Sequence, residues 1–336
     1  MSESVSIFPA AGRRRFLQVA VQAAGAAAVL GLPAVRARAQ AGPDLSRVTL
    51  RVGDQTGAVR GQLQAAGLLD AVPYKIDWSV YPAAVNLHEA LKADATDLGA
   101  ANDSPTVSAI AGGSRVKVVS AWSNGGRGTS LIVPKGSPLR SLADLRGKTI
   151  SPTTRGSVAH FQVVELLKLA GIPLSEVKLA FLSPTDASAA FGSGGLDAWS
   201  IWGIFRARAI GSLGARVLDD GTRVNSGLLL NSATHSALAD PGKRAAIAHF
   251  SDLQERSYAW ARANRQGWID WYAGFAKQAP AVVADLYDEN VSYRRIGVDD
   301  ALVARLRKTY AVWLDTGVLS GAIDFDQYVV RDLAVG

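Results

Sequence analysis

Residues Pro134 to Phe205 read PKGSPLRSLADLRGKTISPTTRGSVAHFQVVELLKLAGIPLSEVKLAFLSPTDASAAFGSGGLDAWSIWGIF. In this stretch, short apolar runs at 149–150, 177–181 and 198–201 alternate with segments of helical period. This alternation predicts parallel strands that are joined by crossover helices. Ligands of such sheets bind beyond the carboxyl ends of the strands, so the polar turns that follow the apolar runs are candidate ligand-binding segments.

The first of these turns, residues 151–157, has the strongest chemical character. Gly156 lets a ligand approach the backbone closely, and Ser157 offers a hydroxyl at the start of a helix that we expect over 157–170. The first N–H groups of a helix have no partner within it and form an anion site, to which Arg155 adds charge. The alternative is a capped helix with a solvated arginine.

Five motifs in this stretch resemble the substrate-binding proteins of ABC transporters for aliphatic sulfonates, within the wider nitrate, sulfonate and bicarbonate group. They are Val133–Pro138, Ser141–Lys148, Arg155–His160, Asp186–Phe191 and Leu196–Trp202. Weaker similarity extends from Val48 to the C-terminus. One departure concerns the ligand, because the family usually has Asp-Pro where this chain has Gly203-Ile204.

The resemblance implies an α/β protein with the two-lobed periplasmic binding protein fold of type II. We therefore expect mixed, mostly parallel sheets and a ligand cleft between the lobes. Residues 45–123 and 226–336 would form the first lobe, and residues 124–225 the second. The glycine-rich segment 124–128 suits a hinge between them, because glycine tolerates large backbone rotations.

The resemblance also implies a function. The chain would be an extracytoplasmic, monomeric binding protein that captures a small organic anion, an aliphatic sulfonate, and delivers it to an ABC permease. It would need no metal or cofactor and would not be an enzyme. Ten positions are candidates for ligand contact: Gln55, Thr56, Ser104, Asn124, Arg155, Gly156, Ser157, His160, Asp186 and Trp202.

Each candidate has a structural alternative. Gln55 and Thr56 lie in a strand-to-helix turn that need not touch a ligand, and Ser104 is also placed to cap a helix. Trp202 ends a strand, where it would wall the ligand's apolar tail or pack in the core. The aromatic side chains at 268, 271, 272 and 275 have helical spacing, which favours packing between helices.

The N-terminal 39 residues have the pattern of an export signal. Gly12–Gln18 resembles a twin-arginine motif, an apolar run follows over 19–32, and Ala37-Arg38-Ala39 predicts cleavage before Gln40 and a periplasmic protein. The alternative is an uncleaved anchor helix. Removing these residues takes away five basic side chains and one acidic one, so the net charge falls from +7 to +3. The remaining charge does not predict nucleic-acid binding.

Composition and motifs argue against other classes of function. With 336 residues, 48% hydrophobic and 19% charged, the chain has a globular composition and the length of two domains. A desulfinase-like enzyme on the same fold is the main alternative, but those enzymes use a cysteine and this sequence has none. The four histidines show no metal-ligand spacing, and the glycines form no nucleotide-binding motif. The effector domain of a transcription regulator would need an N-terminal pair of DNA-binding helices, where this chain has an export signal.

Overall fold

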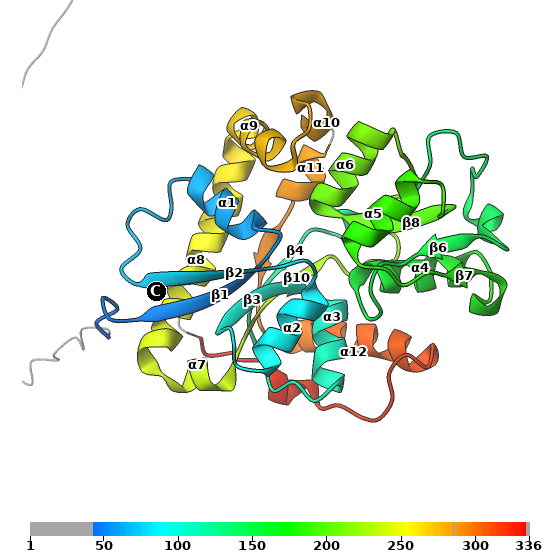
Figure 1. The fold of residues 1–336 in the computed structure, drawn as a ribbon. Coiled ribbons are helices and arrows are strands. Elements are labelled where there is room, and N and C mark those ends of the chain that lie inside the picture. The colour runs from blue at the N-terminus through cyan, green and yellow to red at the C-terminus, as the bar shows by residue number, and fades with distance from the viewer. Residues whose placement is uncertain (1–42, 285, 334–336) are drawn as a thin grey trace, which may run out of the picture. The chain divides into compact units, whose positions relative to one another are not determined.

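The computed structural model describes residues 43–284 and 286–333, which belong to one compact unit, Gly42–Gly336. The predicted export signal lies outside the described residues. Two mixed sheets, each covered by helices, make up the unit, so the predicted two-lobed α/β fold is confirmed (Figure 1).

The first sheet has six strands in the order β11-β4-β10-β3-β1-β2. These are β1 (Thr49–Gln55), β2 (Lys75–Tyr81), β3 (Leu98–Asn102), β4 (Lys117–Ser123), β10 (Leu228–Ala233) and β11 (Arg294–Ile296). β1 pairs in parallel with β2 and β3, because helices α1 (Ala58–Ala65) and α2 (Ala84–Lys92) provide the crossovers that parallel strands need. β10 returns from the second sheet and runs antiparallel to β3 and β4.

The second sheet has five strands in the order β7-β6-β8-β5-β9. These are β5 (Thr129–Val133), β6 (Thr149–Ser151), β7 (Lys178–Leu179), β8 (Ala198–Trp202) and β9 (Arg216–Asp219). α4 (Val158–Leu169) and α5 (Pro184–Gly192) connect the parallel strands β6, β7 and β8, as the alternating pattern predicts. β5 pairs antiparallel with β8 and β9.

The remaining helices cover the sheets and the junction between them. They are α3 (Asp103–Ala111), α6 (Gly203–Leu213), α7 (His235–Ala239), α8 (Pro241–Ala263), α9 (Arg265–Ala276), α10 (Pro280–Ala284), α11 (Tyr287–Val291) and α12 (Asp300–Asp315), with short 3₁₀ helices at Leu142–Leu145, Leu174–Glu176 and Phe325–Tyr328. In the first sheet, Val118 packs with α2, α3 and α12, whereas its neighbour Val119 packs with α8 on the opposite face. Alternate side chains of this strand are therefore buried on both faces of the sheet.

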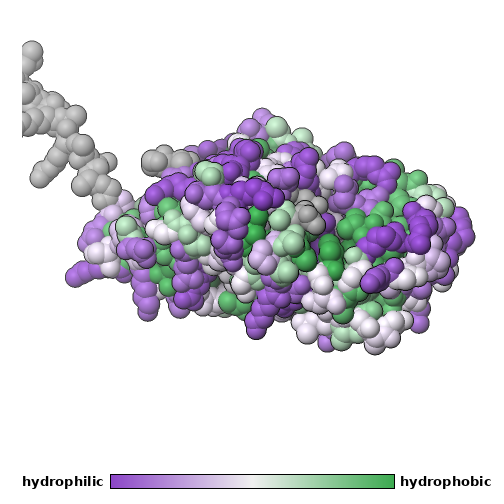
Figure 2. Space-filling view, turned by 90° about the horizontal axis from the view of Figure 1, so that it is seen from above, coloured by the Kyte–Doolittle hydropathy of each residue, from purple (hydrophilic) through white to green (hydrophobic). Residues whose placement is uncertain are grey.

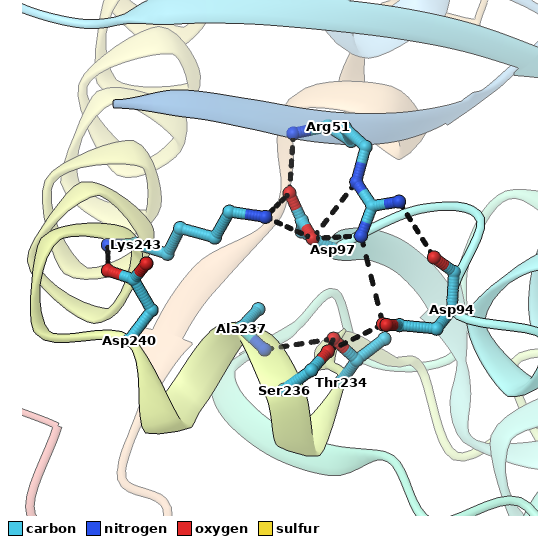
Figure 3. A network of polar contacts seen from close by, with 8 residues as sticks. All are labelled: Arg51, Asp94, Asp97, Thr234, Ser236, Ala237, Asp240 and Lys243. Atoms are coloured by element: carbon cyan, nitrogen blue, oxygen red, sulfur yellow. Dashed lines mark hydrogen bonds and ion pairs between the residues drawn. The ribbon is translucent and has the colours of Figure 1, made fainter. Parts of the chain in front are cut away.

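A buried carboxylate fixes the first sheet to α8 (Figure 3). Asp97, just before β3, has a fully buried side chain. Its two oxygens accept hydrogen bonds from the backbone N–H of Arg51 at 2.9 Å, from the Arg51 guanidinium at 2.6 and 3.1 Å, and from Lys243 Nζ at 2.9 and 3.0 Å. One side chain thus joins β1, the start of β3 and the first turn of α8.

Two opposing effects set the pKa of Asp97. Burial alone would raise it, but the hydrogen bonds from Arg51 and Lys243 outweigh burial and hold the pKa of Asp97 below its usual value. An acid with a lowered folded-state pKa contributes stability above its unfolded pKa and loses it as the pH falls through the folded value. The network therefore stabilises the protein at neutral pH and weakens under acid.

The chain passes between the two sheets in two segments that touch, at 124–128 and 220–227. The N–H of Asn124 donates to the carbonyl of Gly227 at 2.9 Å, and Asn225 Nδ2 donates to the Gly126 carbonyl at 3.5 Å. Gly227 has a φ of +68°, and a Cβ at this position would collide with the backbone nitrogen of Gly126. Arg305 of α12 donates to the carbonyl of Ser226 at 2.7 Å and so holds this junction from the first lobe.

The exposed large apolar side chains are on separate elements: Val80, Leu169, Leu174, Leu213 and Leu314. On the face in Figure 2, apolar side chains lie among hydrophilic ones. Within the described part of the chain, none of the helices has the length and apolar character needed to cross a membrane.

We expect Asp97→Ala to lower the free energy of unfolding by about 2–3 kcal/mol, because it removes several charged hydrogen bonds and leaves two cations without their partner. Urea unfolding at pH 7 measures this change. The matched control is Asp332→Ala, whose 85% exposed side chain pairs with Arg244 and should contribute no more than about 1 kcal/mol. Equal losses in the two variants would contradict the structural role of Asp97.

Gly227→Ala should destabilise the protein more than Gly113→Ala. Both glycines have positive φ, which costs any other residue about 1–2 kcal/mol. A Cβ at Gly113 meets nothing within 4 Å, whereas one at Gly227 meets backbone, so only Gly227→Ala forces the two crossing segments apart. Thermal unfolding compares the variants, and an equal loss would show that the crossing contact adapts without cost.

Candidate functional site

A cavity of about 200 Å³ lies where strand ends of both sheets meet. From the first lobe it is bordered by the end of β1, the start of α1 and the end of β3. From the second it is bordered by the end of β8 and the first turn of α6. Residues of α8, α9, α11 and the segment before β11 complete the walls. The cavity is lined by Asp54, Gln55, Thr56, Ala58, Val59, Gln62, Ala100, Asn102, Trp202, Gly203, Ile204, Leu229, Gln254, Ser257, Tyr258, Trp268, Trp271, Tyr272, Asn290 and Tyr293.

Rings and amides dominate this lining. Six of the lining residues are Trp or Tyr and five are Asn or Gln. On α9, Trp268 stacks on Tyr272 with ring centroids 4.7 Å apart, and Trp271 meets Tyr272 edge to face at 5.5 Å. An apolar wall with a few placed polar groups is typical of small-molecule sites.

Asp54 is the acidic member of the lining and is 1% exposed. Its carboxylate accepts hydrogen bonds from the N–H of Val59 at 3.2 Å and of Arg60 at 2.8 Å, so it occupies the N-terminus of α1. Burial nevertheless raises the pKa of Asp54 to about 6, because these backbone donors and the charge of Arg60 offset only part of the desolvation.

The N-terminus of α6 faces the same cavity from the second lobe. Trp202 is the residue before the helix and makes no side-chain capping bond, and Gly203 has a φ of +56° with open space around its Cα. Gly203 and Ile204 both line the cavity. Since the first N–H groups of a helix lack partners within it, this end is suited to an anion.

The structure brings three of the sequence candidates together at this cavity. Gln55, Thr56 and Trp202 line it, and Gln55 Nε2 donates to the carbonyl of Ala100 at 2.8 Å. Trp199, by contrast, is fully buried in the core of the second lobe. Trp202 packs against the same apolar cluster from the end of β8 but is only partly buried, and of the two tryptophans it is the one that lines the cavity.

The predicted anion turn lies outside this lining and packs against the first lobe. Ser104 Oγ donates to the carbonyls of Gly156 at 3.3 Å and Ser157 at 3.2 Å. Ser157 caps α4 by accepting from the N–H of His160, and Arg155 is exposed with its guanidinium 4.2 Å from the centre of the Phe181 ring. A ligand contact by these residues stays a prediction.

His160 is part of the same lobe contact. Its ring lies between Phe181 and Trp313 of α12, with both centroids 4.9 Å away, and its Nδ1 accepts from the N–H of Gly156 at 3.1 Å. Burial, aided by the charge of Arg155, lowers the pKa of His160 to about 4. The imidazole is therefore neutral at pH 7.

The last two candidates lie in other surroundings. Asn124 is buried in the first crossing segment, where its side chain bonds to the backbone of Gly126 and Arg127. Asp186 is exposed at the start of α5, where its carboxylate accepts a hydrogen bond from Ser183 Oγ at 2.7 Å. In this structure the two side chains serve the crossing and a helix start.

Sequence reasoning missed Asp54 and the α9 rings as cavity residues. Asp54 sits next to Gln55, and nothing in its sequence neighbours signals burial. The helical spacing of the rings at 268, 271 and 272 predicts packing between helices, and Trp268 and Tyr272 are buried in such a cluster. The excess of aromatic residues on one short helix was the available signal that its face also borders a cavity.

Comparisons with known proteins agree with this geometry. Residues 64–198 match the family described as ABC transporter, phosphonate, periplasmic substrate-binding protein. A protein of Escherichia coli named aliphatic sulfonates-binding protein is 34% identical over 179 residues. That match spans 52% of this chain and 56% of the relative, so it covers little more than half of the relative's length.

Solved structures extend the likeness over most of the chain. The alkanesulfonate-binding protein SsuA from Xanthomonas axonopodis, bound to MOPS, is 25% identical with a TM-score of 0.74, covering 87% of this chain and 99% of that one. The desulfurization enzyme DszB, solved with biphenyl-2-sulfinic acid, covers 85% of this chain and 97% of that one at 15% identity and a TM-score of 0.61. The second likeness shows a shared fold alone.

Across residues 43–284 and 286–333, no three His, Cys, Asp or Glu side chains are grouped to hold a metal ion.

Proposed function

Because this chain belongs with the periplasmic substrate-binding proteins of the sulfonate and phosphonate type, we propose that it captures a small sulfonate outside the cytoplasm and delivers it to an ABC permease. One observation carries the proposal. The cavity is bordered by the first turn of α6 from the second lobe and by Gln55 and Thr56 from the first. A ligand held there contacts both lobes, and its binding stabilises their closed arrangement.

The α6 N-terminus is the proposed seat of the sulfonate oxygens. Its uncapped N–H groups supply donors, and the helix dipole favours negative charge. The Gly203-Ile204 sequence supports this role, since the Asp-Pro that is usual in the resembling family would place a carboxylate here and remove one N–H. Trp202 would then cover the carbon chain of the ligand.

The turn at Arg155–Ser157 with Ser104 remains a second proposal for ligand contact. It rests on the helix N-terminus of α4 and on the charge of Arg155. Binding there would require the ligand to replace the hydrogen bonds that Ser104 now donates to the carbonyls of Gly156 and Ser157. The two proposals therefore differ in which substitutions weaken binding.

A desulfinase-like reaction has less support. The likeness to DszB is one of fold, and the 336-residue sequence contains no cysteine to act as nucleophile. The hydroxyls and amides of the cavity are suited to holding a ligand by hydrogen bonds.

Calorimetry with alkanesulfonates tests the cavity. Trp202→Ala should weaken binding about 10- to 100-fold, because it exposes the apolar part of the ligand. Trp78→Ala is the matched control. The Trp78 ring packs against Phe250 outside the cavity, so its removal should leave affinity unchanged.

If Arg155→Ala and Ser157→Ala weaken binding while Trp202→Ala does not, the site is the α4 turn. If sulfate, nitrate and alkanesulfonates all leave the melting temperature unchanged at millimolar concentration, the proposed function fails.

We also propose export through the twin-arginine route with cleavage before Gln40. Replacing Arg13 and Arg14 together by Lys should leave full-length precursor in the cytoplasm, because the motif requires the arginine pair. Mass spectrometry of the exported protein should find Gln40 at its N-terminus. Normal periplasmic accumulation of the double variant would contradict this route.

A further inference from the structure

The charge of the cavity does not suit a simple anion. Asp54 brings a carboxyl group into the lining, and none of the described residues that line the cavity is Lys, Arg or His. An anion alone would share a desolvated space with a second negative group, and like charges in low dielectric repel strongly. The α6 N-terminus carries the equivalent of about half a positive charge, which is too little to offset two negative groups.

Asp54 retains capacity for a further donor. Each carboxylate oxygen accepts one backbone N–H of α1, whereas an ionised carboxylate has about four acceptor sites. The charged and titratable groups that face it are Arg60 on α1 and Tyr258 on α8. Arg60 is exposed and lies outside the lining, so no cation of the lining neutralises the carboxylate.

The rings beside this carboxyl group are suited to a cation. Trp268, Trp271 and Tyr272 form one wall from α9, and Tyr258 and Tyr293 form another pair with centroids 5.2 Å apart. The faces of aromatic rings attract ammonium groups, and a buried carboxylate among rings adds a full opposite charge. The rings and the carboxylate that line this cavity thus both favour an ammonium group.

We propose that the Asp54 end of the cavity binds a protonated amine, so that the preferred ligand is a small amino-substituted sulfonate. The ligand's acid group lies at the N-terminus of α6 and its ammonium group between Asp54 and the aromatic walls. This assignment rests on the proposed function, since it takes the sulfonate from there. It makes Asp54 a residue that determines specificity.

Titration calorimetry with 2-aminoethanesulfonate and ethanesulfonate tests this assignment, because the two ligands differ only in the amine. At pH 7.5 the full chain should bind the amine about 10- to 100-fold more tightly, as expected for a charged hydrogen bond. At pH 5, where Asp54 becomes protonated and the amine keeps its charge, this preference should shrink. Ethanesulfonate should instead bind more tightly at pH 5 than at pH 7.5.

Two variants distinguish an effect of Asp54 on ligand preference from the effect of removing any buried acid. Asp54→Asn should abolish the preference for the amine at pH 7.5. Asp103→Asn, a buried acid outside the lining that accepts from Thr309, should keep the preference. The wild-type comparison between the two pH values needs no variant, so a failure of Asp54→Asn to fold leaves the test intact.

The outcomes distinguish this inference from the proposed function. Equal or tighter binding of ethanesulfonate at pH 7.5 overturns the amine site and leaves a sulfonate-binding protein. A preference for the amine that is the same at both pH values, or that survives in Asp54→Asn, overturns the role of Asp54. Binding of neither sulfonate overturns both proposals.

Discussion

Burying a carboxylate is the physical constraint on which the first lobe depends. Strand β1 contacts one buried carboxylate near its start and contains another near its end. At Arg51 the strand meets Asp97, which is fully compensated by a guanidinium, an ammonium and a backbone N–H. Three residues on, Asp54 lines the cavity and accepts hydrogen bonds from backbone donors alone. The charges around Asp97 fix the first sheet to α8. The second carboxylate is only partly compensated, which is why burial raises its pKa while the pKa of Asp97 is lowered.

The described parts of the two lobes meet at the crossing segments, at α4, and at α6, which packs on α9 and donates from Arg208 to the carbonyl of Ala276. At the crossing segments, backbone meets backbone, and Gly227 is required because any side chain there would strike Gly126. At α4, His160 is enclosed by Phe181 and Trp313, while Ser104 bonds to the turn before the helix. A cleft that opens must bend at the crossings and separate α4 from α12 and α6 from α9, where apolar side chains of both lobes share a core.

The architecture could be predicted from the sequence because it depends on local patterns. Alternating apolar runs and helical segments specify crossovers, and the glycines at 125 and 126 mark the first passage between the lobes. Gln55, Thr56 and Trp202 line the cavity, and their position at the ends of strands is predictable from the sequence. Asp54 was not, since a carboxyl group beside a turn is ordinarily solvated and its burial comes from α8, some 200 residues later in the chain. The double role of the α9 rings also depends on this packing between distant segments. The contact of Arg155 with the ring of Phe181, 26 residues later in the chain, could not be predicted from the turn for the same reason.

The two helix starts that face the cavity show how charge selects a ligand. At the N-terminus of α1, the carboxylate of Asp54 already accepts from the free N–H groups. This helix end therefore presents a carboxylate to the cavity and has no such donor left for an anion. At the N-terminus of α6, the Trp202 side chain makes no capping hydrogen bond, and Gly203 has no side chain to fill the space. This helix end therefore presents backbone N–H donors to the cavity. The cavity is therefore polarised, negative toward the first lobe and positive toward the second. A molecule with opposite charges at its two ends satisfies both starts at once, and it does so only when the lobes are close enough for one small ligand to reach both. Under the proposed assignment, specificity and closure would have a single cause, because the groups that recognise the two ends belong to different lobes.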